Sequence, residues 1–375
     1  MLALSIDAKK FKNNSTELIY IHIPFCHSIC AYCDFHHKAH ADDKQKQLLV
    51  QAIEKELNGR AGFLHPSEAQ TLYIGGGTPS TLSIEQLRII TDTVYKLYPD
   101  ATWRERTIEV NPDDVNPEYL NGLLELGFDR LSMGVQSFNN DHLKRMNRRH
   151  DKECAIQAVK MAQKAGFSNI TIDLIFALPF LTNDQWQYNL DTALSLNVQH
   201  ISAYHLTIEP GTAFDKIGMK PVDDNASEEQ YKMLRDAMAK GGFEHYEISN
   251  FAKPNFRAVH NALYWSGSHY LGIGPSAHSF NGDERQWNIS SNEQYIENCA
   301  FEKELLSDTD KLNELIMTRL RTSDGLEINT ATEHLPTLCD SYIKKGQMEY
   351  NEGWLRILPS SFLLSDMIIA ELFAD

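Results

Sequence analysis

Short apolar segments alternate with helix-forming segments through the first half of the chain. Residues 18–23 are an apolar run of strand length, and residues 42–57 then repeat apolar side chains at the spacing of one helix face. The same alternation predicts further strands over 71–74, 107–110, 130–135, 169–176 and 200–208, and further helices over 83–98, 116–126, 152–165 and 182–196. This succession of six strand–helix units indicates an α/β fold with a parallel sheet or barrel.

The pattern changes near Glu209. Beyond it the sequence predicts, in order, a helix over 227–240, a strand over 243–249, an aperiodic stretch over 253–280, a helical pattern from about 301, a hairpin near 353–354 and a last helix over 364–373. We therefore expect a large domain over residues 1–300 and a small, mainly helical C-terminal domain over residues 301–375.

The composition narrows the class of protein. The chain has 375 residues, more than the usual single-domain ceiling of about 250–300 residues. Its longest strongly apolar run, residues 174–181, is too short for a membrane span, and no secretory signal is recognisable at the start, so we expect a cytoplasmic protein. The formal charge of −16 argues against nucleic-acid binding through a global field, although it leaves a local basic patch open.

The cysteines divide into two groups. Cys26, Cys30 and Cys33 lie in one loop after the first predicted strand, whereas three others are scattered and are interpreted as buried free thiols, namely Cys154, Cys299 and Cys339. Three clustered thiolates supply one ligand fewer than a four-iron cluster or a tetrahedral zinc needs. An iron–sulfur cluster would keep one iron open. A zinc ion would need a nearby histidine from among His22, His27, His36 and His37.

Other polar residues and glycines fall at the ends of the next predicted strands, where α/β barrels place their chemistry. Gly75-Gly76-Gly77-Thr78-Pro79 exposes backbone N–H groups after the second strand, and Glu109 ends the third and could hold an ammonium group. The remaining candidates at or beyond strand ends are Gln136, Arg148, Asp173, His205 and Glu209. A tight turn, a salt bridge or a solvated side chain is the simpler explanation of each residue taken alone.

Taken together, these motifs resemble the radical S-adenosylmethionine (SAM) enzymes, and more closely the branch of oxygen-independent coproporphyrinogen III oxidase. The matching segments are Tyr20-Ile-His-Ile-Pro-Phe-Cys26, the cysteine spacing that follows, Gly75–Pro79, Glu109-Val-Asn-Pro, Gly134-Val-Gln-Ser-Phe138 and Ile172–Pro179. The resemblance covers almost the whole chain and includes Leu320-Arg321 and Gly325-Leu326 of the C-terminal domain.

The resemblance implies a partial (β/α)6 barrel and a [4Fe–4S] cluster held by Cys26, Cys30 and Cys33. It also implies a set of SAM-binding residues, namely Tyr20, Tyr32, Gly76, Gly77, Thr78, Glu109, Gln136, Arg148 and Asp173. SAM would chelate the open iron, and an electron entering the cluster would cleave it to methionine and a 5′-deoxyadenosyl radical. The protein would position and shield this cofactor chemistry.

Two departures select a subgroup. Coproporphyrinogen oxidases of this family carry a further cysteine where this chain has Phe35, and they have a longer N-terminal arm. Both features disfavour decarboxylation of coproporphyrinogen and instead resemble the HemW-like haem chaperones, which pass haem to acceptors such as respiratory enzymes. Decarboxylation remains the alternative activity.

A second motif supports the haem-chaperone subgroup. His260-Asn261-Ala262-Leu263-Tyr264-Trp265 matches its His-Asn-x-x-Tyr-Trp motif, and an imidazole with two aromatic rings suits a haem. A buried core histidine is the simpler alternative for His260, and His205, His245 or His278 could serve as the ligand instead. Since haem carries carboxylates, we also expect a locally basic patch to receive them.

Overall fold

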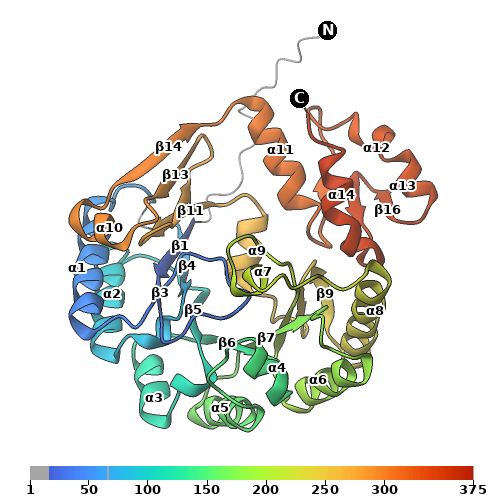
Figure 1. Ribbon diagram of the computed structural model, residues 1–375. Coiled ribbons are helices and arrows are strands. Elements are labelled where there is room, and N and C mark those ends of the chain that lie inside the picture. Colours follow the sequence, from blue (N-terminus) through green and yellow to red (C-terminus); the bar gives the residue numbers. More distant parts are fainter. Residues whose placement is uncertain (1–16, 66, 375) are drawn as a thin grey trace.

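The computed structural model describes residues 17–65 and 67–374. Its centre is a twelve-stranded sheet in which seven strands run parallel, and the first six of these along the chain are joined by helices. Along the chain these elements are β1 (Glu17–Ile23), α1 (Asp43–Gly59), β4 (Ala69–Gly76), α2 (Ile84–Leu97), β5 (Glu105–Val110), α3 (Pro117–Glu125), β6 (Arg130–Gln136), α5 (Lys152–Ala165), β7 (Ile170–Phe176), α6 (Asn183–Ser195), β8 (His200–His205) and α8 (Asp224–Lys240). The helices lie on the outside of the curved sheet (Figure 1).

The local sequence explains why these elements form where they do. The parallel strands are buried on both faces, as in β1, where only Tyr20 is not fully buried, so their side chains are almost continuously apolar. Several helices begin at a polar cap: the Ser83 hydroxyl accepts a hydrogen bond from the Gln86 N–H, and the Gln86 side-chain oxygen accepts one from the Ser83 N–H. Helix α5 ends at Gly166, whose φ of 118° is a left-handed conformation that favours glycine.

Further strands extend the sheet at both ends. At one end β11 (His269–Ile273) pairs parallel with β1, and β12 (His278–Phe280), β13 (Glu284–Asn288) and β14 (Phe301–Leu305) follow in antiparallel order. At the other end β10 (Asn250–Ala252) pairs with β8, and β9 (Glu244–Glu247) pairs with β10. Because β14 and β9 are the two ends of the strand order, the sheet is open among the described residues. The predicted α/β class, with parallel strands joined by helices, is confirmed.

Two of the predicted regions need correction. The stretch 253–280, which has no sequence period, contains helix α9 (Val259–Trp265) as well as β11 and β12. Residues 301–305 are not helical but form β14, and they belong to the large sheet. The helical pattern begins instead at α11 (Asp308–Arg319).

The C-terminal elements include a small sheet of their own. It has the strand order β15 (Leu326–Glu327), β17 (Trp354–Ile357), β16 (Met348–Asn351), and the hairpin predicted near residue 353 is β16–β17. The helices around it are α12 (Leu335–Leu338), α13 (Asp340–Lys344) and α14 (Ser365–Ala370). The boundary at residue 300 stays a prediction.

The remaining short elements are β2 (Phe25–Cys26), β3 (Lys38–Ala39), α4 (Asn140–Arg145), α7 (Ala213–Lys216) and α10 (Asn292–Asn298), with 3₁₀ turns at Pro79–Thr81, Pro112–Asp114 and Pro359–Leu364. Among the described residues no helix is both long and apolar enough to cross a membrane.

Candidate functional site

A pocket of about 960 Å³ opens at the carboxyl ends of the parallel strands. It is lined by every residue proposed from the sequence for the cluster, SAM or haem, except Trp265 and the alternative haem ligand His245. These lining residues are Tyr20, Cys26, Cys30, Tyr32, Cys33, Gly76, Gly77, Thr78, Glu109, Gln136, Arg148, Asp173, His260, Asn261 and Tyr264. The fold therefore brings segments separated by more than two hundred residues to one cavity.

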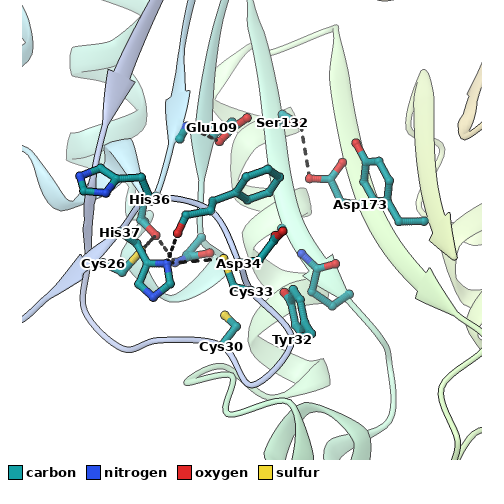
Figure 2. A pocket seen from close by; sticks show the side chains of 18 of the residues that line it. Cys26, Cys30, Tyr32, Cys33, Asp34, His36, His37, Glu109, Ser132 and Asp173 are labelled. Carbon is teal, nitrogen blue, oxygen red and sulfur yellow. Dashed lines mark hydrogen bonds between the residues drawn. The ribbon is translucent and has the colours of Figure 1, made fainter. Parts of the chain in front are cut away.

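The cysteine loop, residues 26–33, follows β1 and is held by the backbone of neighbouring segments. Ala31 donates its N–H to the carbonyl of Met146 at 3.0 Å and accepts a hydrogen bond from the N–H of Phe214 at 2.9 Å. Figure 2 shows the three cysteines on this loop, below Glu109 of β5 and Asp173 of β7. This support fixes the backbone of the loop, so the three thiols stay together at the edge of the pocket.

Polar groups contact two of the thiols. The Thr78 hydroxyl donates to Cys26 Sγ at 3.4 Å, and Arg148 Nη1 lies 3.3 Å from Cys30 Sγ. Burial raises the pKa of the Cys33 thiol to about 12, so metal binding there would release a proton. No three His, Cys, Asp or Glu side chains among the described residues converge as the ligands of a single ion would. A four-iron cluster does not require the thiols to converge on one point, because each thiolate binds a different iron.

The glycines after β4 allow the cysteine loop to approach the strand. A Cβ on Gly77 would lie 2.9 Å from the Phe25 carbonyl oxygen and 3.0 Å from Cys26 Sγ. The Gly77 N–H donates to the carbonyl of Ile23 at 2.8 Å, and Gly76 has a φ of 116°. A side chain at Gly77 would therefore displace the loop that carries the thiols.

Glu109 and Asp173 are buried carboxyl groups in the wall of the pocket. Glu109 accepts hydrogen bonds from the Tyr73 hydroxyl at 2.8 Å and from the Gly76 N–H at 3.1 Å. Burial raises the pKa of Glu109 to about 7 and that of Asp173 to about 6. A cation in the pocket would lower the pKa of both groups and so favour their charged forms. Tyr73 was not predicted from the sequence, although its place two residues before Gly75 puts it on the same face of β4 as that glycine.

Arg148 and Gln136 present polar atoms that the described residues leave unpaired. Arg148 Nη2 donates to Asn111 Oδ1 and to the Gly134 carbonyl, each at 2.6 Å, but its Nε has no partner among the described residues. Gln136 Oε1 is likewise buried and unpaired within the described part of the chain. Such atoms are costly unless a ligand or water satisfies them, so this part of the pocket fits a polar cofactor.

Tyr20 of β1 and Tyr32 of the cysteine loop both line the pocket. The Tyr20 hydroxyl lies 3.1 Å from Nδ1 of His22, whose Nε2 contacts the carbonyl of His36. Burial raises the pKa of both Tyr20 and Tyr32, so each stays a neutral phenol at neutral pH. They supply aromatic walls beside the thiols without adding charge.

Helix α9 brings the His-Asn-x-x-Tyr-Trp motif to the opposite wall. His260 is 5% exposed, its Nδ1 lies 2.8 Å from the Thr71 hydroxyl, and its ring lies 5.0 Å from that of Tyr73. Burial lowers the pKa of His260 to about 3, so the imidazole is neutral. Tyr264 lines the pocket, whereas Trp265 lies outside it, with its ring 5.9 Å from the guanidinium of Arg321.

A carboxylate from a distant strand anchors α9. Glu105 of β5 accepts the N–H groups of Val259 at 2.7 Å and His260 at 3.0 Å, and it lies 3.8 Å from the buried guanidinium of Arg130. Glu105 and Arg130 were not predicted from the sequence. Each is a single charged residue at the start of a strand, and no motif or periodic spacing distinguishes it from other charged residues. Together they fix where the motif meets the pocket.

The fold and the cysteine loop define a radical SAM protein. The Radical SAM superfamily profile matches residues 20–193. Coproporphyrinogen III oxidase (HemN) from Escherichia coli superposes with a TM-score of 0.82 over 98% of this chain and 92% of that one, and at 22% identity the likeness shows the fold alone.

The chain belongs to the HemW family within this superfamily. A Bacillus subtilis protein named Heme chaperone HemW is 32% identical over 95% of this chain and 99% of its own length. The Heme chaperone HemW of Escherichia coli is 35% identical over 69% of each chain. The family resemblance drawn from the motifs is confirmed.

Proposed function

We propose that this chain holds a [4Fe–4S] cluster and SAM in the pocket and binds haem for delivery to other proteins. Cys26, Cys30 and Cys33 would hold the cluster. Such a cluster with bound SAM supplies one-electron cleavage of SAM. The unpaired atoms of Arg148 and Gln136 support the placement of a polar cofactor beside the thiols.

The contacts to SAM are assigned from the pocket wall. Glu109 would accept hydrogen bonds from the cofactor's amino group, and Gly76, Gly77 and Thr78 would lie along its methionyl part. Asp173, Gln136 and Arg148 would bind the remainder, with Tyr20 and Tyr32 beside the cluster. All of these residues line the same cavity.

One observation carries the haem assignment: α9 places its motif in the wall of the pocket that the cysteine loop also lines. His260, Asn261 and Tyr264 would contact the haem from this wall. Ligation of iron by His260 would use Nε2, because Nδ1 lies against the Thr71 hydroxyl. Trp265, the last residue of α9, would act from outside the pocket, where its ring lies beside that of Tyr264 and the guanidinium of Arg321. The names of the HemW relatives support this assignment.

A haem titration of anaerobically purified, cluster-reconstituted protein tests the proposal. We expect a saturable Soret band that weakens in Tyr264→Ala but not in Tyr350→Ala, a matched change at an exposed tyrosine outside the pocket. Haem-loaded protein should then transfer its haem to a haem-free acceptor. A Soret band no stronger than that of free haem, for both the wild type and His260→Ala, would overturn the haem assignment.

The alternative is oxidative decarboxylation of coproporphyrinogen III. Phe35 argues against it, because this side chain stands where the oxidases have a cysteine and is 68% exposed at the pocket. An anaerobic assay with SAM and a reductant distinguishes the two functions. Robust protoporphyrinogen formation would favour the oxidase.

A further inference from the structure

The pocket wall is too acidic to hold a ligand through carboxylates that belong to the ligand. Among the described lining residues there are five carboxyl groups and two arginines, and no lysine. The carboxyl groups are those of Asp34, Glu109, Asp113, Asp173 and Glu209. The basic patch expected from the sequence is therefore not found in this lining.

Both arginines are already engaged. Arg148 contacts Cys30 Sγ, Asn111 and the Gly134 carbonyl, so it belongs to the cluster side of the pocket. Arg149 lies 3.0 Å from Asp113 and 3.4 Å from Asp114. Of their buried donors, Arg148 Nε alone has no partner among the described residues, and it is assigned to the polar cofactor. A carboxylate ligand would therefore have to break one of these arrangements or displace that cofactor to gain a cation.

The histidines on the haem side do not replace the missing cations. Burial lowers the pKa of His205, His260 and His278, so their rings are neutral at pH 7 and above. Glu209 adds negative charge at the same wall, and its carboxylate has no ion-pair partner among the described residues.

What this side of the pocket does offer is aromatic and apolar surface. Tyr264 stacks on Tyr270 with ring centroids 4.4 Å apart, and Ile175, Leu206 and Ala277 line the same cavity. Next to the cysteine loop, Phe35 adds an exposed ring to the lining of the pocket. A porphyrin has a broad apolar face and two carboxylates at one edge, and burying those carboxylates without a cation is costly.

We propose that haem enters this pocket with its ring inward and leaves both propionates in water. This inference rests on the proposed function. The pocket would then recognise haem through its iron and its apolar ring. It should therefore also bind metalloporphyrins whose carboxylates are esterified. The propionates then remain available to a haem acceptor while the ring is still held.

Paired titrations with ferric haem and ferric haem dimethyl ester test the inference on cluster-reconstituted protein with SAM. We expect the two dissociation constants to agree within about threefold, because neither ligand exchanges a carboxylate–water contact for a salt bridge. An ester that binds more than about tenfold more weakly would show a propionate clamp and overturn the inference. Binding of neither ligand would overturn the proposed function itself, and the inference with it.

Glu209→Gln gives a second measurement. Removing this carboxylate should tighten haem binding about twofold to threefold, by relief of screened repulsion, and leave ester binding unchanged. Glu229→Gln, an exposed position of α8 outside the pocket, is the matched control and should change neither. Weaker haem binding in Glu209→Gln would contradict the proposed orientation.

Discussion

Replacing Glu109 by Gln tests two effects of this buried carboxyl group separately. One is its effect on the free energy of unfolding, and the other is its proposed contribution to SAM binding. The variant keeps an oxygen that can accept from the Tyr73 hydroxyl and the Gly76 N–H. It removes a group whose pKa burial raises from 4.5 to about 7. The folded chain therefore retains a proton that the unfolded chain releases between these two pH values.

The sign of the effect follows from this proton. As pH rises from 4.5 to 7, the free energy of unfolding of the wild type falls, and above pH 7 the loss is complete. At about 1.4 kcal/mol per pKa unit the loss is about 3 kcal/mol. We expect the Glu109→Gln variant to be more stable than the wild type by about 3 kcal/mol at pH 8 and by less than about 1 kcal/mol at pH 5.

Urea unfolding of cofactor-free protein at both pH values measures this difference. The same variant should bind SAM at least about tenfold more weakly, because an ammonium or amine donor loses a charged acceptor. The reasoning fails if the variant is no more stable than the wild type at pH 8. Unchanged SAM affinity with the predicted gain in stability would instead remove Glu109 from the proposed cofactor contacts.

Three further changes test other parts of the site. Cys30→Ala should abolish cluster assembly, measured as iron and acid-labile sulfide, whereas Cys154→Ala should not; a full brown chromophore in Cys30→Ala would contradict the ligand assignment. Gly77→Ala should reduce cluster loading, because its Cβ would meet backbone oxygen at 2.9 Å, while Gly62→Ala, with nothing within 4 Å, should load normally. Glu105→Gln should lower the free energy of unfolding by about 3–5 kcal/mol, because it leaves the buried Arg130 without its anion. Urea unfolding measures this loss. A loss under about 1 kcal/mol would show that Glu105 does not anchor α9.

The parallel part of the fold was predictable because its strands are buried on both faces. An apolar run such as 170–176 marks a strand whatever surrounds it, and the intervening helices repeat their apolar side chains every three or four residues. The convergence of the cysteines with Glu109 was predictable for the same reason, since parallel strands end at one edge of the sheet.

Other elements depend on contacts that no local pattern shows. Strand β14 is exposed at every residue, so it has no apolar period, and its pairing with β13 defines it. Helix α9 is only seven residues long and is held by the carboxylate of Glu105. Between β11 and β12, Gly272 approaches the His278 carbonyl so closely that a Cβ would lie 1.9 Å from it. These contacts join residues that the sequence pattern treats as independent.

The position of β1 has a consequence for synthesis of the chain. β1 is the first described strand, yet it pairs on both sides, with β4 early in the chain and with β11 much later. While the ribosome makes the residues between them, one edge of this apolar strand has no partner, and an open apolar edge can pair with other chains. The cysteine loop directly follows that edge. The nascent protein therefore passes through a stage in which the three thiols have been synthesised but Tyr264 and Tyr270 have not. The wall that contains these two tyrosines is thus the last part of the pocket to form.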